Sequence, residues 1–155
     1  GCQRVAAACV ATGLLDYLNH SEGARASHYA RSVGTWRRPH GEHLPLARGL
    51  RAAIGAAIPV IGVGRVTPPE EAEQALADDI CDLVAMTRAH IADPDVIAKA
   101  MSGRVAQIRP CVGANQGCVD RMVGGLPITC FHNPSVGREA WARDLTPGRG
   151  PVLVV

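Results

Sequence analysis

Aromatic side chains are scarce in this sequence, which contains one Phe, two Tyr and two Trp among 155 residues. Hydrophobic residues still make up 47% of the chain, so there is enough apolar material for one packed domain. With so few aromatics the core must be built from Ala, Val, Leu and Ile, a mixture typical of parallel strands that alternate with helices. The composition therefore favours an α/β fold.

Long hydrophobic runs and an excess of charge of one sign are also missing. No stretch approaches the roughly 20 apolar residues needed to cross a bilayer, and residues 58–63 have the length of a buried strand instead. The 16 basic and 14 acidic residues give a formal charge of +2, which leaves no strong field to attract nucleic acid. We therefore expect a protein that contacts neither membrane nor nucleic acid.

Cysteines are unevenly distributed along the chain. They are Cys2, Cys9, Cys81, Cys111, Cys118 and Cys130. The last three fall in one short segment, and such clustering indicates a metal or cluster site in a reducing compartment rather than a set of disulfides, so we expect a cytoplasmic protein. The first three lie in an Ala-rich helical stretch or beside an apolar strand, and we expect them to be buried structural thiols.

Helix and strand patterns alternate over the first two thirds of the sequence. The predicted strands are residues 14–18, 58–63 and 82–86, and the predicted helices are residues 3–12, 44–57, 68–77 and 94–101. Repeated strand–loop–helix units with short connections build a parallel sheet, in either a (β/α)8 barrel or an open doubly wound sheet. From residue 107 the alternation stops, and a segment rich in Cys, Gly and Asn runs to residue 134.

Glycine and arginine occur where the second and third predicted strands end. Gly64 and Arg65 follow the earlier of these strands, and Thr87 and Arg88 follow the later one. Barrel enzymes place their sites at such C-terminal strand ends, where loop amides and an arginine side chain can hold a phosphate. In the alternative interpretation, the glycines only turn the chain and the arginines are surface cations.

The spacing of Cys111, Cys118 and Cys130 suits more than one kind of site. Thiolates bind iron–sulfur clusters and zinc, and a pair on a Gly-containing turn with a distant third can wrap a cluster. A small structural zinc-binding module would use the same three cysteines together with His132. Three free thiols in a cofactor-free interaction domain are the third interpretation.

Residues 62–139 contain the segments GVGRVTPPEEAEQAL, DLVAMTRAHIADPDVIAKAMSGR, IRPCVGANQGCVDR and ITCFHNPSVGRE. These segments resemble the multidomain NADH:flavin oxidoreductase branch of the old yellow enzyme class, which includes trimethylamine dehydrogenase and 2,4-dienoyl-CoA reductase. The resemblance implies an FMN-binding (β/α)8 TIM barrel, then a 4Fe-4S cluster loop, then a nucleotide-binding domain that uses FAD and NAD(P)H.

The resemblance also divides the chain into segments. Residues 1–106 would be the C-terminal part of the barrel, about strands 6 to 8, and residues 107–135 the cysteine-rich cluster loop. Residues 136–150 would be a linker, and residues 151–155 the first strand of a truncated FAD/NAD(P)-binding domain. Because residues 1–10 also read as the interior of a longer chain, we expect a fragment that is inactive by itself.

Particular residues receive roles from this resemblance. It assigns the FMN phosphate to Gly64, Arg65, Thr87 and Arg88, and the cluster to Cys111, Cys118 and Cys130. The complete enzyme would perform NAD(P)H:flavin chemistry on a small-molecule substrate, either ene or enoyl reduction or oxidative demethylation of an amine. A homo-oligomer is compatible with this resemblance.

One position departs from the family pattern. The pattern has a cysteine where this sequence has Ala114, and alanine cannot bind iron. Three outcomes stay open at this stage. One iron is left to water or to a side chain such as Asn115 or His132, or a three-iron cluster forms, or the cluster is lost.

The segment of residues 19–43 is longer than a loop that only connects two elements of a compact domain, and we expect it to be functional. The resemblance places substrate-facing groups in this loop. His28 and Tyr29 are candidates for a proton donor to the substrate, against the alternative that both are ordinary loop residues.

Overall fold

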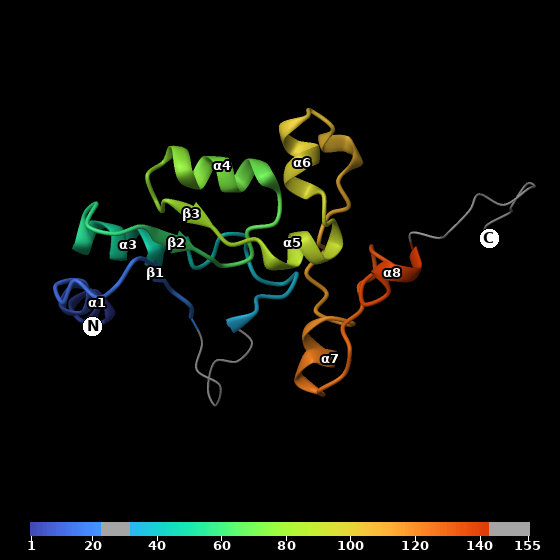
Figure 1. The fold of residues 1–155 in the computed structure, drawn as a ribbon, viewed down its shortest axis with the longest axis horizontal. Helices are drawn as coiled ribbons and strands as arrows, with labels where there is room; N and C mark the ends of the chain where they lie inside the picture. The colour runs from blue at the N-terminus through green and yellow to red at the C-terminus, as the bar shows by residue number, and fades with distance from the viewer. Residues whose placement is uncertain (23–31, 143–155) are drawn as a thin grey trace, which may run out of the picture.

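The computed structural model describes residues 1–22 and 32–142, which form short helices around a small sheet (Figure 1). The strands are β1 (Leu18–Asn19), β2 (Val60–Gly62) and β3 (Leu83–Val84). The helices are α1 (Cys2–Val10), α3 (Leu44–Ile54), α4 (Pro69–Ala77), α5 (Thr87–Ala92), α6 (Val96–Met101), the 3-10 helix η1 (Val105–Gln107), α7 (Val119–Val123) and α8 (Glu139–Ala142).

The strands form one parallel sheet in the order β1-β2-β3. Leu18 lies opposite Val60, and Ile61 lies opposite Leu83. Parallel neighbours need long crossover connections, and α3 and α4 supply them between successive strands. The predicted α/β class with a parallel sheet is therefore confirmed.

Proline and glycine set the limits of the crossover helices. Helix α3 carries a proline in its first turn and ends at Gly55, whose φ of 60° suits a glycine cap. Helix α4 begins after Pro68 in an extended conformation. Glu70 and Glu71 occupy its first turn, where negative charge interacts favourably with the helix dipole.

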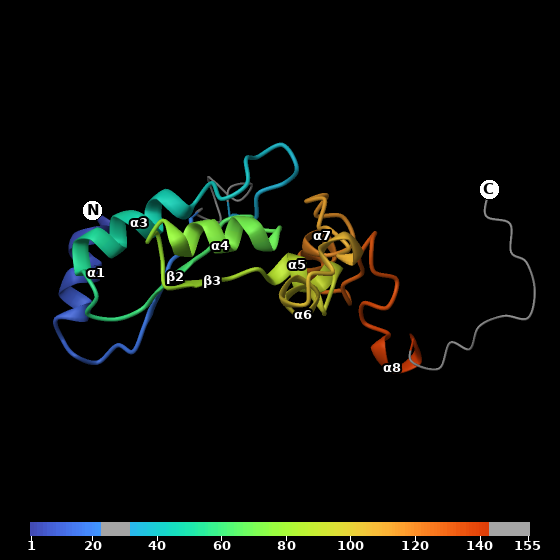
Figure 2. The same ribbon diagram turned by 90° about the horizontal axis from the view of Figure 1, so that it is seen from above.

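Helices α3 and α4 lie on the same side of the strands, so the two form a layer against the sheet (Figure 2). Between these layers lies a core cluster of buried residues: Ala47, Val60, Ala75, Ile80 and Cys81. Val60 is fully buried, and burying such a side chain contributes about 1.5–3 kcal/mol. A second cluster, formed by Val66, Ala72, Met86 and Ala89, extends this core toward the ends of the strands.

Two predictions of local structure need correction. The first strand is Leu18–Asn19 rather than residues 14–18, because β2 begins opposite Leu18 and earlier residues have no strand beside them. Leu14 is accordingly 84% exposed. Residues 87–92 form helix α5, where only a loop was expected after residue 86.

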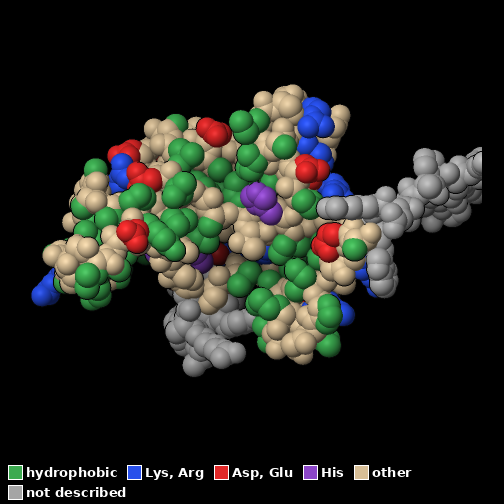
Figure 3. All heavy atoms as spheres, viewed as in Figure 1, with side chains coloured by type: hydrophobic (Ala, Val, Ile, Leu, Met, Phe, Trp, Pro, Cys, Tyr) green, Lys and Arg blue, Asp and Glu red, His purple; other side chains and the backbone are tan. Residues whose placement is uncertain are grey.

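Large apolar side chains are exposed near the strands and near α7, and apolar groups cover much of the face in Figure 3. Leu14 and Tyr17 before β1 and Leu83 in β3 are more than half exposed, as are Met122 and Val123 in α7. In the described part of the chain, no helix has both the length and the apolar content to cross a membrane.

Candidate functional site

A cavity of about 290 Å³ lies beyond the C-terminal ends of β2 and β3. All four residues predicted to hold a phosphate line it, namely Gly64, Arg65, Thr87 and Arg88. The cavity also reaches the cysteine-rich segment, because Cys118 forms part of its wall. Loops that are distant in sequence meet here because parallel strands present their carboxyl ends at one edge of the sheet.

The turn after β2 leaves no room for a side chain at Gly64. A Cβ atom added there would lie 2.6 Å from Cβ of His43 and 2.7 Å from its backbone nitrogen. Gly64 has φ of 135°, and Arg65 follows with φ of 59°, which is uncommon for a residue with a side chain. The absent Cβ lets this turn pack directly against His43 while Gly64 still lines the cavity.

Arg65 connects the turn with two other loops. Its Nη1 donates to the carbonyl oxygen of Arg38. A Cβ added at Gly113 would lie 3.1 Å from Arg65 Nε, so the guanidinium packs against the backbone of the cysteine-rich segment. Arg65 Nε is buried and has no hydrogen-bond partner in the described structure. A buried donor left without an acceptor is costly, so this atom indicates a place for an anion or a polar ligand.

Arg88 forms a second connection across the cavity. Its Nη1 donates to the carbonyl oxygen of Gly34 at 2.8 Å and to Oδ1 of Asn115 at 2.7 Å. The amide of Asn115 in turn donates to the carbonyl oxygen of Val33 at 2.9 Å. Asn115 adopts φ of 63°, and with both ends of its side chain engaged it is not free to serve as an iron ligand.

His43 and Glu42, just before α3, place two buried polar side chains beside the cavity. His43 is 2% exposed and lines the cavity, and its Nε2 lies 3.4 Å from a carboxylate oxygen of Glu22 and 3.7 Å from one of Glu42. These are ion-pair distances without hydrogen-bond geometry. The ring of His20 lies within reach of the carbonyl oxygen of His43, at 3.0 Å. His28 and Tyr29 lie outside the described residues.

The cysteine loop, residues 111–130, brings its three thiols into one neighbourhood. Cys111, Cys118 and Cys130 are all half-buried. Burial raises the pKa of the Cys118 thiol against the opposing effects of the Val119 backbone N–H and of Arg88, and the charges of Cys111 and Cys130 raise it as well, so both lie near Cys118. The backbone N–H of Thr129 donates to the carbonyl oxygen of Gly117 and aligns the stretches that precede Cys118 and Cys130.

The other cysteines are split between surface and core. Cys81 is 3% exposed, as predicted, and lies under Gly62. Cys2 and Cys9 are exposed, so the prediction that they are buried is wrong. Helix α1 packs against α3 with Ala6 as its one buried residue, which leaves the two thiols outside the contact.

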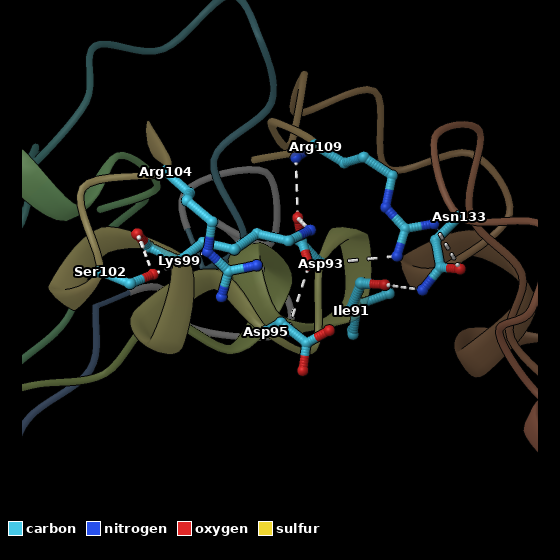
Figure 4. Close-up of polar contacts among 8 residues, drawn as sticks. All are labelled: Ile91, Asp93, Asp95, Lys99, Ser102, Arg104, Arg109 and Asn133. Carbon is cyan, nitrogen blue, oxygen red and sulfur yellow. Dashed lines mark hydrogen bonds and ion pairs between the residues drawn. The ribbon is translucent and has the colours of Figure 1, made fainter. Parts of the chain in front are cut away.

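A buried carboxylate, Asp93, and a buried amide, Asn133, hold the chain on the two sides of the cysteine loop (Figure 4). Asp93 is fully buried and accepts hydrogen bonds from Lys99 Nζ at 2.6 Å and from the backbone N–H of Arg109 at 2.9 Å. Burial alone would raise the pKa of Asp93, but these bonds outweigh it and the pKa is lowered. On the other side of the loop, Asn133 accepts a bond from Arg109 Nη1 at 3.2 Å. These contacts were not predicted from the sequence, in which Asp93 only precedes the predicted helix of residues 94–101.

The geometry does not favour the zinc module. Among residues 1–22 and 32–142, no group of three or more His, Cys, Asp and Glu side chains is arranged to hold a metal ion. A zinc ion needs its ligands about 2.0–2.3 Å from one centre, whereas an iron–sulfur cluster spreads its thiolates over several iron atoms. His132 is engaged through Nδ1, which lies 2.6 Å from the carbonyl oxygen of Pro110.

Comparison with known proteins identifies relatives across most of the chain. The profile of the NADH:flavin oxidoreductase / NADH oxidase family matches residues 17–107. The chain is 42% identical over 119 residues to a metal reductase of Desulforamulus reducens, covering 76% of this chain and 17% of that protein. It is 35% identical over 153 residues to N,N-dimethylglycine/sarcosine dehydrogenase of Chromohalobacter salexigens, covering 96% of this chain and 22% of the relative.

A solved structure shows the same arrangement of elements. The 2-naphthoyl-CoA reductase complex with 2-naphthoyl-CoA matches with a TM-score of 0.79 and 31% identity, over 88% of this chain and 20% of that one. The chain thus spans about a fifth of the length of the proteins it matches. The resemblance seen in the sequence is confirmed, and the chain belongs to the NADH:flavin oxidoreductase / NADH oxidase family of flavin-dependent oxidoreductases, in the old yellow enzyme class.

Proposed function

We propose that this chain is the C-terminal part of an FMN-binding (β/α)8 barrel, about strands 6 to 8, followed by an iron–sulfur cluster loop. One observation carries the proposal: Gly64, Arg65, Thr87 and Arg88 line one cavity at the ends of two adjacent parallel strands, and Cys118 lines it too. Barrels hold phosphate in the loops after their last two strands, where glycine lets an anion approach the main chain.

The cavity fits the phosphate end of FMN. Gly64 brings the backbone of the turn to the cavity wall, and the unpaired Nε of Arg65 is a buried donor in the same turn. Arg88 adds positive charge while its bonds to Gly34 and Asn115 hold it in place. In this arrangement the loop amides bind the phosphate and the two arginines neutralise its charge.

The cysteine loop fits a cluster held by three thiolates. Cys111, Cys118 and Cys130 are the proposed ligands, because Cys118 lines the cavity and Cys111 and Cys130 lie close enough for their charges to act on it. Ala114 supplies no ligand at the fourth position, and Asn115 is already occupied by Arg88. We therefore propose a cluster with one iron not bound to a cysteine, or a three-iron cluster, rather than a four-cysteine 4Fe-4S centre.

When bound, FMN supplies hydride transfer and a cluster supplies one-electron transfer, so the complete enzyme would reduce an ene or enoyl substrate or oxidatively demethylate an amine. The names of the relatives support both types of reaction, because they include a dehydrogenase of methylated amines and a reductase of an aromatic acyl-CoA. Electrons would pass to or from NAD(P)H through an FAD-containing domain that follows residue 150. The four segments with limits at residues 106, 135 and 150 remain our proposal, and α8 lies within the suggested linker.

The exposed apolar surface supports the idea that other parts of a longer protein cover this segment. Leu14, Tyr17 and Leu83 lie beside the sheet, where further barrel strands would pack. In such a protein the reduced cysteines favour the cytoplasm, and the substrate is a small molecule. A homo-oligomer of the complete enzyme is compatible with this arrangement.

Comparison of FMN with riboflavin tests the phosphate site. The complete protein should bind FMN about 100-fold more tightly than riboflavin, since two charge-assisted contacts to phosphate account for such a factor. The preference should largely vanish in Arg88→Ala and persist in Arg48→Ala, which changes an exposed arginine on α3. Equal binding of FMN and riboflavin by the wild type would contradict the site. Analysis of iron, sulfide and zinc in the same sample would separate the cluster from a zinc module.

A further inference from the structure

We propose that Asp93 and Asn133 are positioning residues, which hold Cys111 and Cys130 at one fixed separation so that both thiols reach the same cluster. The inference rests on the proposed cluster function and extends it to residues that are not ligands. It follows from the contacts at the two ends of the cysteine loop (Figure 4).

Two hydrogen bonds join the chain just before the cysteine loop to the chain just after it, and we call this pair of contacts the neck. Arg109 Nη1 donates to Oδ1 of Asn133 at 3.2 Å, and His132 Nδ1 lies 2.6 Å from the carbonyl oxygen of Pro110. Cys111 directly follows Pro110, and Cys130 comes shortly before His132. The neck therefore holds together the stretches of backbone that carry the two outermost thiols.

The neck is fastened to α5 and to the turn after it. Asp93 accepts a hydrogen bond from the backbone N–H of Arg109 at 2.9 Å, and Asn133 Nδ2 donates one to the carbonyl oxygen of Ile91 at 2.9 Å. Helix α5 also carries Arg88 on the wall of the cavity. Helix α5 therefore contacts both the neck and the proposed phosphate cavity, and it fixes the position of one relative to the other.

Burial makes this attachment strong and specific. Asp93 is fully buried and Asn133 is 2% exposed, so neither can exchange its partners for water. Lys99 Nζ lies 2.6 Å from Asp93 and neutralises the carboxylate, which also accepts the hydrogen bond from the backbone N–H of Arg109. Groups that orient metal ligands without touching the metal commonly change metal affinity by about 10- to 100-fold when they are replaced.

The test uses the complete protein, purified without oxygen and loaded with FMN, iron and sulfide. Asn133→Leu keeps the approximate volume of the side chain and removes its bonds to Arg109 and Ile91, and Asp93→Asn removes the charge of the carboxylate. Asp95→Asn is the matched control, because that exposed aspartate contributes only its backbone N–H to the network. FMN per chain, melting temperature, iron per chain, the visible spectrum of the cluster and the rate of iron loss to a chelator are measured together.

We expect Asn133→Leu to lose iron about 10- to 100-fold faster than wild type, with an altered cluster spectrum and unchanged FMN content, while Asp95→Asn behaves like wild type. Wild-type iron retention in both Asn133→Leu and Asp93→Asn would overturn the inference. Parallel loss of FMN, melting temperature and iron in Asn133→Leu would overturn it too, by showing a general structural role. Wild-type protein that binds FMN but no iron would refute the proposed cluster itself, and the inference with it.

Discussion

Arg88 and Asn115 are joined by a 2.7 Å hydrogen bond from the guanidinium Nη1 to the side-chain carbonyl oxygen. Arg88 lines the cavity beyond the parallel strands, and Asn115 lies in the cysteine loop immediately after Ala114. The bond therefore ties the proposed phosphate site to the proposed cluster site. Charge-assisted bonds of this kind are roughly twice as strong as neutral ones, so the two sites are mechanically connected.

Replacement of Arg88 by lysine tests this connection. Lysine keeps the positive charge but lacks the planar fork that reaches Gly34 and Asn115 together. We expect FMN affinity of the complete protein to fall roughly 10- to 100-fold, measured by titration of flavin fluorescence. Arg48→Lys, on the exposed side of α3, should have no effect. Unchanged FMN affinity in Arg88→Lys would mean that charge alone suffices.

Gly64 should not tolerate even an alanine. The added Cβ would lie 2.6 Å from Cβ of His43, and φ of 135° is unfavourable for any residue with a side chain. We expect Gly64→Ala to weaken FMN binding at least tenfold in equilibrium dialysis, since strain of this kind costs on the order of 1–3 kcal/mol. Gly103→Ala is the control, because Gly103 also has positive φ but open space around it. Tight FMN binding by Gly64→Ala would show that the turn can move aside.

The buried Asp93 predicts a specific dependence of stability on pH. Its pKa is lowered in the folded state despite burial, by Lys99 and by the N–H groups of Arg109 and Asp95. A lowered pKa stabilises the fold at pH values above the pKa of the unfolded state, which is about 3.9. This contribution to stability is lost as the pH falls through the pKa of the folded state. The melting temperature of Asp93→Asn should therefore lie well below that of wild type at pH 7, and the gap should narrow in acid. A gap independent of pH would contradict the charged state of Asp93.

Introducing a cysteine at position 114 should complete the set of thiolates. If Cys111, Cys118 and Cys130 hold a cluster, Ala114→Cys should raise the iron content of the complete protein and slow the loss of iron to a chelator. Ala114→Ser is the control for a small polar side chain without a thiolate. An identical chelator-labile fraction in all three proteins would show that position 114 does not face the cluster.

Thiol reactivity distinguishes Cys81 from the other cysteines. Its side chain is 3% exposed, and burial raises the pKa of its thiol, so both access and thiolate formation are suppressed. In native protein Cys81 should react with a thiol reagent only upon unfolding, while Cys2 and Cys9 on the surface of α1 react at once. Mass spectrometry after timed labelling resolves each site, and rapid modification of Cys81 would refute its place in the core.

Sequence reasoning succeeded where local pattern decides structure. The β-rich runs around β2 and β3, the helical spacing of apolar residues in α3 and the proline-marked start of α4 are local signals, and residues that follow successive parallel strands must converge. Gly64, Arg65, Thr87 and Arg88 follow such strands and line one cavity, while their binding of phosphate stays a prediction.

Features that depend on distant contacts were missed. The start of β1 is set by its pairing with Val60, which no local pattern reveals. Two residues separate helix α5 from the end of β3, and the helix has no capping side chain, so the sequence contains no start signal for it. The contacts of Asp93 with Arg109 and of Arg109 with Asn133 join segments far apart in sequence, and neither residue type nor spacing announces them.

The order β1-β2-β3 gives the middle strand two partners, while each outer strand has one partner within the described ranges. In the part of the chain that the structure describes, β1 and β3 therefore each keep one row of backbone N–H and C=O groups available for a further strand. Additional parallel strands could extend the sheet at these two rows, as closure of the proposed barrel would require.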